Sequence, residues 1–268
     1  MKTFGIISDE RAFRSKSPLM HNHVFKSINM DAVYVPFCVQ SSHIENALKG
    51  IKALHVSGVN VTVPYKQTVI PFLDQLSDEA AAIGAVNTID NKDEKLVGYN
   101  TDASGLMDVF ELNHIALSNR NALVFGTGGA ARAVLYALKH MQTSIVYVAG
   151  RDTQKTSVLA KDMSVQPVSL YDVNLKALCP DIIINATSIS SPEESKELAV
   201  FIQQLSMYSV SHVIDINYGR KTNIWQNLSQ RLGATFMDGR NMLAAQAARS
   251  FYIWTANRVN ISEYMSVL

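Results

Sequence analysis

The sequence has 268 residues, of which 47% are apolar and 18% are charged, and its formal net charge is +1. These values fit a globular protein with a large core, organised as one large domain or two ordinary ones. The balanced charge gives no reason to expect a nucleic acid or an anionic membrane as a partner. The apolar run before Ser8 is too short for a signal peptide, and no segment approaches the length of a membrane span. We therefore expect a cytoplasmic protein.

Neither the two cysteines nor the closely spaced histidines form a metal-binding pattern. Cys38 and Cys179 lie far apart and show no C-x-x-C spacing, so we expect reduced, buried thiols. The spacing of His21 and His23 points them to different sides of a helix, and no third ligand lies nearby in the sequence. We expect no metal ion in this protein.

Short strands and helices alternate over the first hundred residues. β-Branched and aromatic residues predict strands, and apolar residues at helical spacing predict helices. The expected strands are 3–7, 32–39 and 58–66, the expected helices are 17–28, 43–54 and 103–112, and 86–102 is expected to form a hairpin with Asn-Lys-Asp-Glu at its tip.

A second alternation of strands and helices begins after a polar link around Asn119. The expected strands are 122–126, 144–150, 181–187 and 212–218, with a helix after each of the first three, and a long helix covers 241–259. Strands that alternate with helices imply a parallel sheet with helices on both faces. The change of rhythm places a domain boundary near residue 102, so we expect an α/β fold of two domains.

The segment NALVFGTGGAARAVLYAL contains the pattern G-x-G-x-x-A between an apolar strand and an Ala-rich helix. Gly126 permits a tight turn, Gly128 lets the backbone approach a pyrophosphate, and Ala131 allows the helix to pack closely on the strand. The start of the helix then presents N–H groups and a positive dipole end to the phosphates. In this strand–turn–helix context the pattern predicts a dinucleotide-binding site.

The residues after the next strand bear on which dinucleotide binds. An NAD site usually has an acidic residue about twenty residues after the glycines, which holds the ribose 2′-hydroxyl. Here the strand ends at Gly150, followed by Arg151, with Lys155 one helical turn later, and the two cations favour the 2′-phosphate of NADP. Asp152 would repel that phosphate unless it points away, or could bind the ribose of NAD, so NAD is the alternative. The three charges also fit a solvated helix start in which Asp152 is the N-cap.

Two features of the first hundred residues are ordinary when taken alone. Ser17 fits a helix N-cap with Pro18 at the first helical position, although the paired hydroxyls of Ser15 and Ser17 would also suit a small carboxylate. Lys66 follows an alternating strand that Pro64 ends, where a lysine is most often a surface residue. A strand end is also a rigid place for a catalytic amine.

Six short motifs occur in order over nearly the whole chain: RSKSPLMH, NVTVPYK, GAVNT, GYNTD, GTGGAARA and DGRNMLAAQAA. Together they resemble the shikimate dehydrogenase family, including its quinate-using members. The resemblance implies an α/β enzyme with a substrate-binding and catalytic domain over 1–102 and a Rossmann-type dinucleotide domain, with a doubly wound parallel sheet, over 103–238. It also implies that the C-terminal helix, within 239–268, packs back on the first domain.

The resemblance assigns roles to the residues that match the family's motifs. Lys66 and Asp102 become an acid–base pair that moves the hydroxyl proton in the reversible, NADP-dependent reduction of 3-dehydroshikimate to shikimate. The implied ligands of the small-molecule substrate are Ser15, Ser17, Thr62, Asn87, Tyr218 and Gln246. The implied contacts of the cofactor are Gly126, Gly128, Gly129, Ala130, Arg151, Lys155, Thr187 and Gly239.

Several positions depart from the family's pattern and keep other functions open. Arg14 precedes the first serine where a histidine is common, NATS continues as ISSPEE instead of soon reaching Gly-Met, and Asn241 replaces a glycine. One alternative is a quinate/shikimate dehydrogenase that uses NAD, and another is a ligand-binding regulator without turnover on the same fold. A methylene-tetrahydrofolate dehydrogenase also pairs a lysine with a Rossmann domain, but the serine pair and GAVNT argue against it. Both a monomer and a homodimer are compatible with the sequence.

Overall fold

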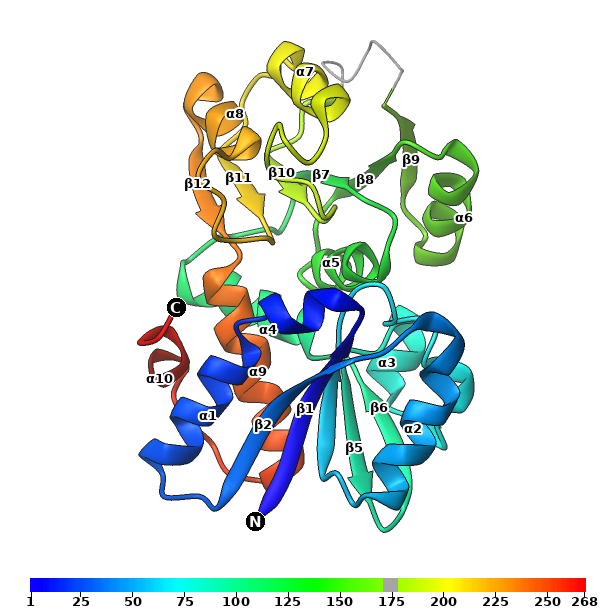
Figure 1. The fold of residues 1–268 in the computed structure, drawn as a ribbon. Coiled ribbons are helices and arrows are strands. Elements are labelled where there is room, and N and C mark those ends of the chain that lie inside the picture. The colour runs from blue at the N-terminus through cyan, green and yellow to red at the C-terminus, as the bar shows by residue number, and fades with distance from the viewer. Residues whose placement is uncertain (171–177) are drawn as a thin grey trace. The chain divides into compact units, whose positions relative to one another are not determined.

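The computed structural model describes residues 1–170 and 178–268, and the chain divides into two compact units (Figure 1). The first unit comprises Met1–Leu106 and Asn241–Leu268, and the second unit comprises Met107–Arg240. Among the helices of the described residues, none is both long and apolar enough to cross a membrane.

The first unit is built on a six-stranded mixed sheet. Its strands are β1 (Lys2–Ser8), β2 (Ala32–Cys38), β3 (Gly58–Val61), β4 (Gln75–Leu76), β5 (Thr88–Lys92) and β6 (Lys95–Tyr99). They lie in the order β2-β1-β3-β5-β6-β4. The strand β1 is parallel to β2 and β3, whereas β5 is antiparallel to its neighbours β3 and β6. The first unit is therefore an α/β structure with a mixed, not a purely parallel, sheet.

The predicted strand 58–66 is shorter than expected, because β3 ends at Val61 and the chain then turns. The N–H of Tyr65 donates to the carbonyl of Thr62 at 2.9 Å. Lys66 therefore follows a turn, and its own carbonyl accepts the N–H of Val86 at 2.7 Å. This second bond ties the lysine to the segment that leads into β5.

The predicted hairpin is confirmed as β5 and β6. Its two connecting residues, Asp93 and Glu94, both have positive φ, 52° and 60°, as a type I′ turn requires. Several short elements of this unit were not predicted, among them β4 and the helix α3 (Asp78–Ile83). The two residues of β4 are too few to show an alternation of apolar and polar side chains.

Helices surround this sheet, and the C-terminal ones complete its core. Besides α3 they are the 3-10 helices η1 (Glu10–Arg14), η2 (Ser41–His43) and η3 (Ile70–Phe72), α1 (Ser17–Ser27), α2 (Ile44–Ala53), the first residues of α4 (Thr101–Leu112), most of α9 (Arg240–Thr255), and α10 (Ile261–Met265). Phe251 and Trp254 of α9 pack in one buried cluster with Phe4 and Phe25. The indole N–H of Trp254 also donates to the carbonyl of Ile89 at 3.0 Å. The expected return of the C-terminal helix to the first domain is confirmed.

The second unit is built on a six-stranded sheet in which every pair of neighbours is parallel. Its strands are β7 (Asn121–Phe125), β8 (Ile145–Gly150), β9 (Gln166–Ser169), β10 (Ile182–Asn185), β11 (His212–Asp215) and β12 (Thr235–Asp238). Their order, β9-β8-β7-β10-β11-β12, is the 3-2-1-4-5-6 order of the doubly wound dinucleotide-binding fold. The Rossmann-type sheet expected from the sequence is confirmed.

Both faces of this parallel sheet are buried. Its helices include α5 (Gly129–His140), α6 (Thr153–Met163), α7 (Lys196–Gln204) and α8 (Ile224–Leu232). Leu123 and Phe125 of β7 pack with Leu198 of α7 and Trp225 of α8. The intervening Val124 is 0% exposed as well, although successive side chains of a strand point to opposite faces. Such strands need cover on both sides, which explains their continuous apolar runs.

Candidate active site

Lys66 and Asp102 form a nearly buried ion pair in the first unit. The Nζ atom of Lys66 lies 2.5 Å from Oδ2 of Asp102, and the two side chains are 12% and 8% exposed. Asp102 lies in the first turn of α4, where the positive end of the helix dipole favours a carboxylate. The side-chain oxygen of Asn100 accepts the N–H groups of Asp102 and Ala103, at 3.1 and 3.3 Å, and so fixes the start of this helix.

Asn87 holds the second oxygen of the same carboxylate. Its Nδ2 atom donates to Oδ1 of Asp102 at 2.9 Å and also lies 2.9 Å from Oγ1 of Thr101. Its Oδ1 atom accepts the backbone N–H of Thr101 at 2.7 Å. Gln246 of α9 joins this group, because its Oε1 lies 3.3 Å from Asn87 Nδ2. The structure thus brings four of the predicted residues, Lys66, Asp102, Asn87 and Gln246, into one hydrogen-bonded group.

The three other predicted residues of the first unit lie at two loop–element junctions. Ser15 Oγ accepts the N–H of Ser17 at 3.2 Å, at the point where η1 gives way to α1. The N-cap position of α1 is occupied by Lys16, so the interpretation of Ser17 as N-cap is wrong; Ser17 is buried inside the helix start and its hydroxyl contacts that of Tyr34. Thr62 is half-buried directly after β3, and its N–H donates to the carbonyl of Ile7 at 3.1 Å.

The glycine turn of the second unit has the shape that a dinucleotide needs. Gly126 has a φ of +125°, and an added Cβ would lie 2.7 Å from the carbonyl oxygen of Ala186, so this position requires glycine. At Gly128 no atom lies within 4 Å of the place where a Cβ would be, which leaves room for a ligand at the start of α5. Gly129 and Ala130 are the first two residues of that helix, whose N–H groups suit a phosphate.

Arg151, Asp152 and Lys155 lie at the start of α6, after β8. Asp152 is the N-cap: its side chain accepts the N–H of Lys155 at 3.0 Å, and this bond holds the pKa of the carboxyl below its usual range. Its other oxygen lies 3.5 Å from Nζ of Lys155. The helix-cap interpretation of Asp152 is therefore confirmed. Arg151 and Lys155 are both exposed, so both cations are accessible to a ligand.

Thr187, Tyr218 and Gly239 follow β10, β11 and β12, respectively. The carbonyl of Thr187 accepts a bond from the side-chain amide of Asn217 at 2.8 Å, which joins the first two of these loops. An added Cβ at Gly239 would overlap the carbonyl of Ile216, so glycine allows the close approach of two backbones. All predicted residues of the second unit thus follow the carboxyl ends of parallel strands, where ligands of such sheets bind.

Buried polar residues that sequence reasoning did not assign to the site surround these groups. In the first unit they are Asn60, Thr88, Thr101 and Ser250, and in the second unit Asn185 and Asp215. Asn60, Thr88 and Thr101 belong to the family motifs NVTVPYK, GAVNT and GYNTD, so the sequence could have indicated that they lie near the site. Ser250 carries no such signal, because an isolated serine within a long helix is unremarkable.

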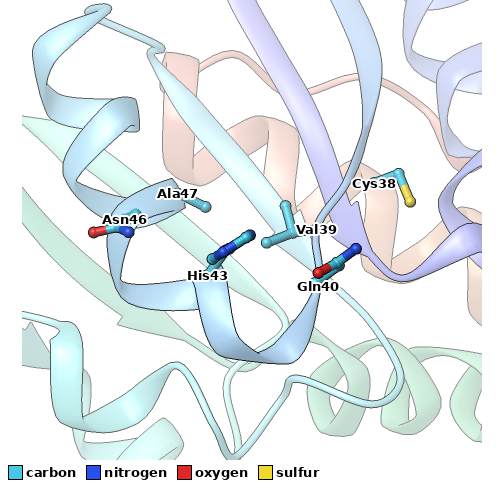
Figure 2. A pocket seen from close by; sticks show the side chains of 6 residues that line it. All are labelled: Cys38, Val39, Gln40, His43, Asn46 and Ala47. Carbon is cyan, nitrogen blue, oxygen red and sulfur yellow. The ribbon is translucent and has the colours of Figure 1, made fainter.

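A surface hollow of about 580 Å³ lies elsewhere on the first unit (Figure 2). It is lined by Cys38, Val39, Gln40, His43, Asn46 and Ala47, none of which is a predicted site residue. Cys38 lies at the opposite end of the hollow from Asn46 (Figure 2). Cys38 and Cys179 are both exposed, so the expectation of buried thiols is wrong; Cys38 is the last residue of β2, an edge strand with β1 as its one neighbour in the sheet. Among the described residues, no group of three or more His, Cys, Asp or Glu side chains could hold a metal ion.

Comparisons with known proteins agree with this arrangement. Two family models match: the shikimate dehydrogenase substrate binding domain over residues 10–89, and shikimate / quinate 5-dehydrogenase over residues 109–231. The shikimate dehydrogenase (NADP(+)) of Pyrococcus furiosus is 37% identical over 260 residues, which cover 97% of this chain and 92% of that protein.

Solved structures resemble the whole chain. A crystal structure of shikimate dehydrogenase from Aquifex aeolicus is 30% identical, with a TM-score of 0.89 over 100% of this chain and 97% of that one. A structure from Thermus thermophilus in complex with NADP(H) and shikimate is 28% identical, with a TM-score of 0.87 over 100% and 98% of the two chains. The motifs, both sheets and these matches lead to one conclusion: the chain belongs to the shikimate dehydrogenase family.

Proposed function

We propose that this protein is an NADP-dependent dehydrogenase that interconverts shikimate and 3-dehydroshikimate. The observation that carries the proposal is the nearly buried Lys66–Asp102 pair, at 2.5 Å, in a chain of this family. A nearly buried lysine with a single acidic partner suits a residue that gives and takes a proton. The relatives from Pyrococcus furiosus and Thermus thermophilus support the choice of substrate and cofactor.

In the proposed reaction, Lys66 moves the proton of the substrate's hydroxyl group. During oxidation the neutral amine accepts that proton while the alcohol carbon loses a hydride, and during reduction the ammonium returns the proton to the carbonyl oxygen. Asp102 accepts a hydrogen bond from the ammonium and so orients it and compensates its charge. Asn87 keeps the carboxylate in place through its bond to Oδ1.

We assign substrate binding to the residues that match the family's motifs. The hydroxyls of Ser15 and Ser17, beside the start of α1, suit the carboxylate of shikimate, because a helix start favours an anion. Thr62, Asn87, Tyr218 and Gln246 are the proposed partners of the ring hydroxyls. Fixing the ring by several such bonds holds the reacting carbon in a productive geometry.

NADP, when bound, supplies or accepts the hydride. The residues that would hold it are Gly126, Gly128, Gly129, Ala130, Arg151, Lys155, Thr187 and Gly239. The room beside Gly128 and the start of α5 fit a pyrophosphate. The exposed cations Arg151 and Lys155 fit a 2′-phosphate, and Asp152 is engaged in capping α6.

The proposal is tested with the purified protein, shikimate or quinate, and NADP or NAD, by following the absorbance of reduced nicotinamide. We expect the highest kcat/KM with shikimate and NADP. Absence of turnover with all four combinations would refute the proposed function, and thermal stabilisation by shikimate without turnover would instead indicate a ligand-binding regulator. Turnover that favours quinate or NAD would correct the substrate or the cofactor alone.

A further inference from the structure

A pair of buried hydroxyl groups lies behind the proposed catalytic pair in the first unit. Thr88 is the first residue of β5, and Ser250 lies in α9; both residues are 0% exposed. Their Oγ atoms are 2.8 Å apart, although the residues are 162 positions apart in the sequence. A buried hydroxyl is costly to leave without partners, so the surroundings of this pair define what it does.

The two hydroxyls share their partners with the side-chain amide of Asn60. Nδ2 of Asn60 lies 3.0 Å from both Thr88 Oγ1 and Ser250 Oγ. Ser250 Oγ also lies 2.9 Å from the carbonyl of Gln246 and 3.1 Å from Oγ1 of Thr101, so its one proton can go to Gln246 or to Thr88 Oγ1. Because Nδ2 of Asn60 can only donate, the oxygens of both hydroxyls accept from it. Neither hydroxyl proton therefore points to Nδ2 of Asn60.

The hydroxyl of Thr88 is one of the donors that fix which way the Asn87 amide faces. Thr88 Oγ1 donates to Oδ1 of Asn87 at 3.0 Å, beside the backbone N–H of Thr101 that donates to the same oxygen. With Oδ1 held on this side, Nδ2 faces Asp102 and donates to its Oδ1 atom. The opposite orientation would place an amide oxygen against a carboxylate oxygen, and two acceptors without a proton repel each other.

The same network reaches the other end of the proposed substrate site. Oδ1 of Asn60 accepts the hydroxyl proton of Tyr34 at 2.8 Å. The hydroxyl of Tyr34 in turn contacts the side chain of Ser17, a proposed ligand of the substrate's carboxylate. One continuous set of buried hydrogen bonds therefore connects Tyr34, beside Ser17, with Asp102. A fully paired network of this kind is rigid, because every rotation breaks a bond in a medium of low dielectric.

We propose that Thr88 and Ser250 are positioning residues for the Lys66–Asp102 pair. They hold the amide of Asn87 in the orientation that fixes the Asp102 carboxylate, and they do so without touching the substrate. The proposal rests on the proposed function for its kinetic readout, but the placement of Lys66 next to Asp102 can also be measured without turnover.

The test compares Thr88→Val with Thr88→Ser. Valine keeps the shape of threonine and removes the hydroxyl, whereas serine keeps the hydroxyl. We expect Thr88→Val to lower kcat for shikimate oxidation about 10- to 100-fold, since small displacements of catalytic groups have effects of this order. KM for shikimate should change much less, and Thr88→Ser should restore most of kcat. Thr255→Val, in α9, is the matched control, because it removes a threonine hydroxyl outside the network. The Thr255 hydroxyl donates to the carbonyl of Phe251 at 2.8 Å.

Two further measurements keep the proposal falsifiable. Ser250→Ala, a smaller change, is expected to lower kcat in the same way. If Thr88→Val does not fold, Ser250→Ala tests the proposal in its place. Trace acetylation of Lys66 by acetic anhydride, mapped by mass spectrometry, should be faster in the variants because the ammonium loses a fixed partner. Variants that fold, with lower thermal stability but wild-type kcat and wild-type acetylation of Lys66, would overturn the proposal. A wild-type protein that turns over neither shikimate nor quinate would refute the proposed function, and acetylation alone would then test this inference.

Discussion

At the scale of single residues, the burial of His21 connects the stability of the protein to pH. Its ring is 0% exposed and stacks on Tyr34 with 4.5 Å between the ring centroids. Neither ring nitrogen has a hydrogen-bond partner among the described residues, and the hydroxyl of Tyr264, whose ring packs against His21, has none either. Burial therefore lowers the pKa of His21 from 6.5 to about 3.

The sign of the pH effect follows from this shift. Between pH 6.5 and about pH 3 the unfolded chain binds a proton at His21 and the folded protein does not, so the free energy of unfolding falls as the pH is lowered. Above pH 6.5 both states are neutral and the contribution is constant. The slope within the window is roughly 1 kcal/mol per pH unit.

We predict that His21→Phe removes this acid-side loss of stability. The measurement is urea unfolding of the wild type and the variant at several pH values on both sides of 6.5. His43→Gln, at the exposed start of α2, is the control and should follow the wild type. Wild-type and His21→Phe stabilities that change in parallel over the acid window would contradict the account of His21.

At the scale of elements, the start of α6 combines a structural and a functional role in Asp152. The carboxylate caps the helix through the N–H of Lys155, at 3.0 Å, and stands beside the cations proposed to hold a 2′-phosphate. Asparagine caps a helix about as well as aspartate but carries no charge. The two roles can therefore be separated by substitution.

We predict that Asp152→Asn retains the thermal midpoint and raises the preference for NADP over NAD a few-fold, because a negative charge near the phosphate is removed. Asp152→Ala should lower the midpoint, since the cap is lost. The measurement is the ratio of kcat/KM for the two cofactors, together with thermal unfolding. Asp78→Asn, at the start of α3 in the first unit, is the control and should leave the ratio unchanged. An unchanged ratio in Asp152→Asn would show that this carboxylate does not influence cofactor choice.

At the scale of the whole molecule, Trp254 connects the end of the chain to its beginning. Its indole is 8% exposed, lies 5.0 Å from the ring of Phe4 between centroids, and donates to the carbonyl of Ile89 at 3.0 Å. A Cβ on Gly58 of β3 would overlap the same indole, so glycine at that position makes room for it. Strands β1, β3 and β5 therefore all contact one side chain of α9.

We predict that Trp254→Ala destabilises the protein by about 3–5 kcal/mol, through the cavity and the carbonyl left without a donor. The measurement is the free energy of unfolding in urea. Tyr252→Ala, on an exposed part of the same helix, should cost less than about 1 kcal/mol. A loss in Trp254→Ala no larger than in Tyr252→Ala would contradict the account of how the C-terminal helix completes the first unit.

The sequence predicted those helices and strands whose own side-chain pattern is enough to determine their structure. The strands β7, β8 and β10 have continuous apolar and β-branched runs, and the hairpin of β5 and β6 has its turn residues. The edge strands β9 (QPVS) and β12 (TFMD) lack such a run, because their pairing with β8 and β11 makes them strands. The short α8 and α10 were missed as well.

Sequence motifs also predicted only that part of the candidate site whose residues lie within them. Motifs identified Lys66, Asp102 and Asn87, which the fold brings into contact. Ser250 could not be found in this way, because only the packing of α9 against β5 brings it to Thr88. The exposure of Cys38 could not be predicted either, because it depends on the tertiary structure, in which β2 is the edge strand of its sheet.

The central claim is that Lys66 transfers a proton during the oxidation of shikimate, and substitution of that residue tests it most directly. We predict that Lys66→Ala lowers kcat with shikimate and NADP about 10²- to 10⁴-fold, while NADP affinity, measured by binding to the free enzyme, stays at the wild-type value. Lys49→Ala, an exposed lysine of α2, should leave both quantities unchanged. A Lys66→Ala variant with wild-type kcat would contradict the account.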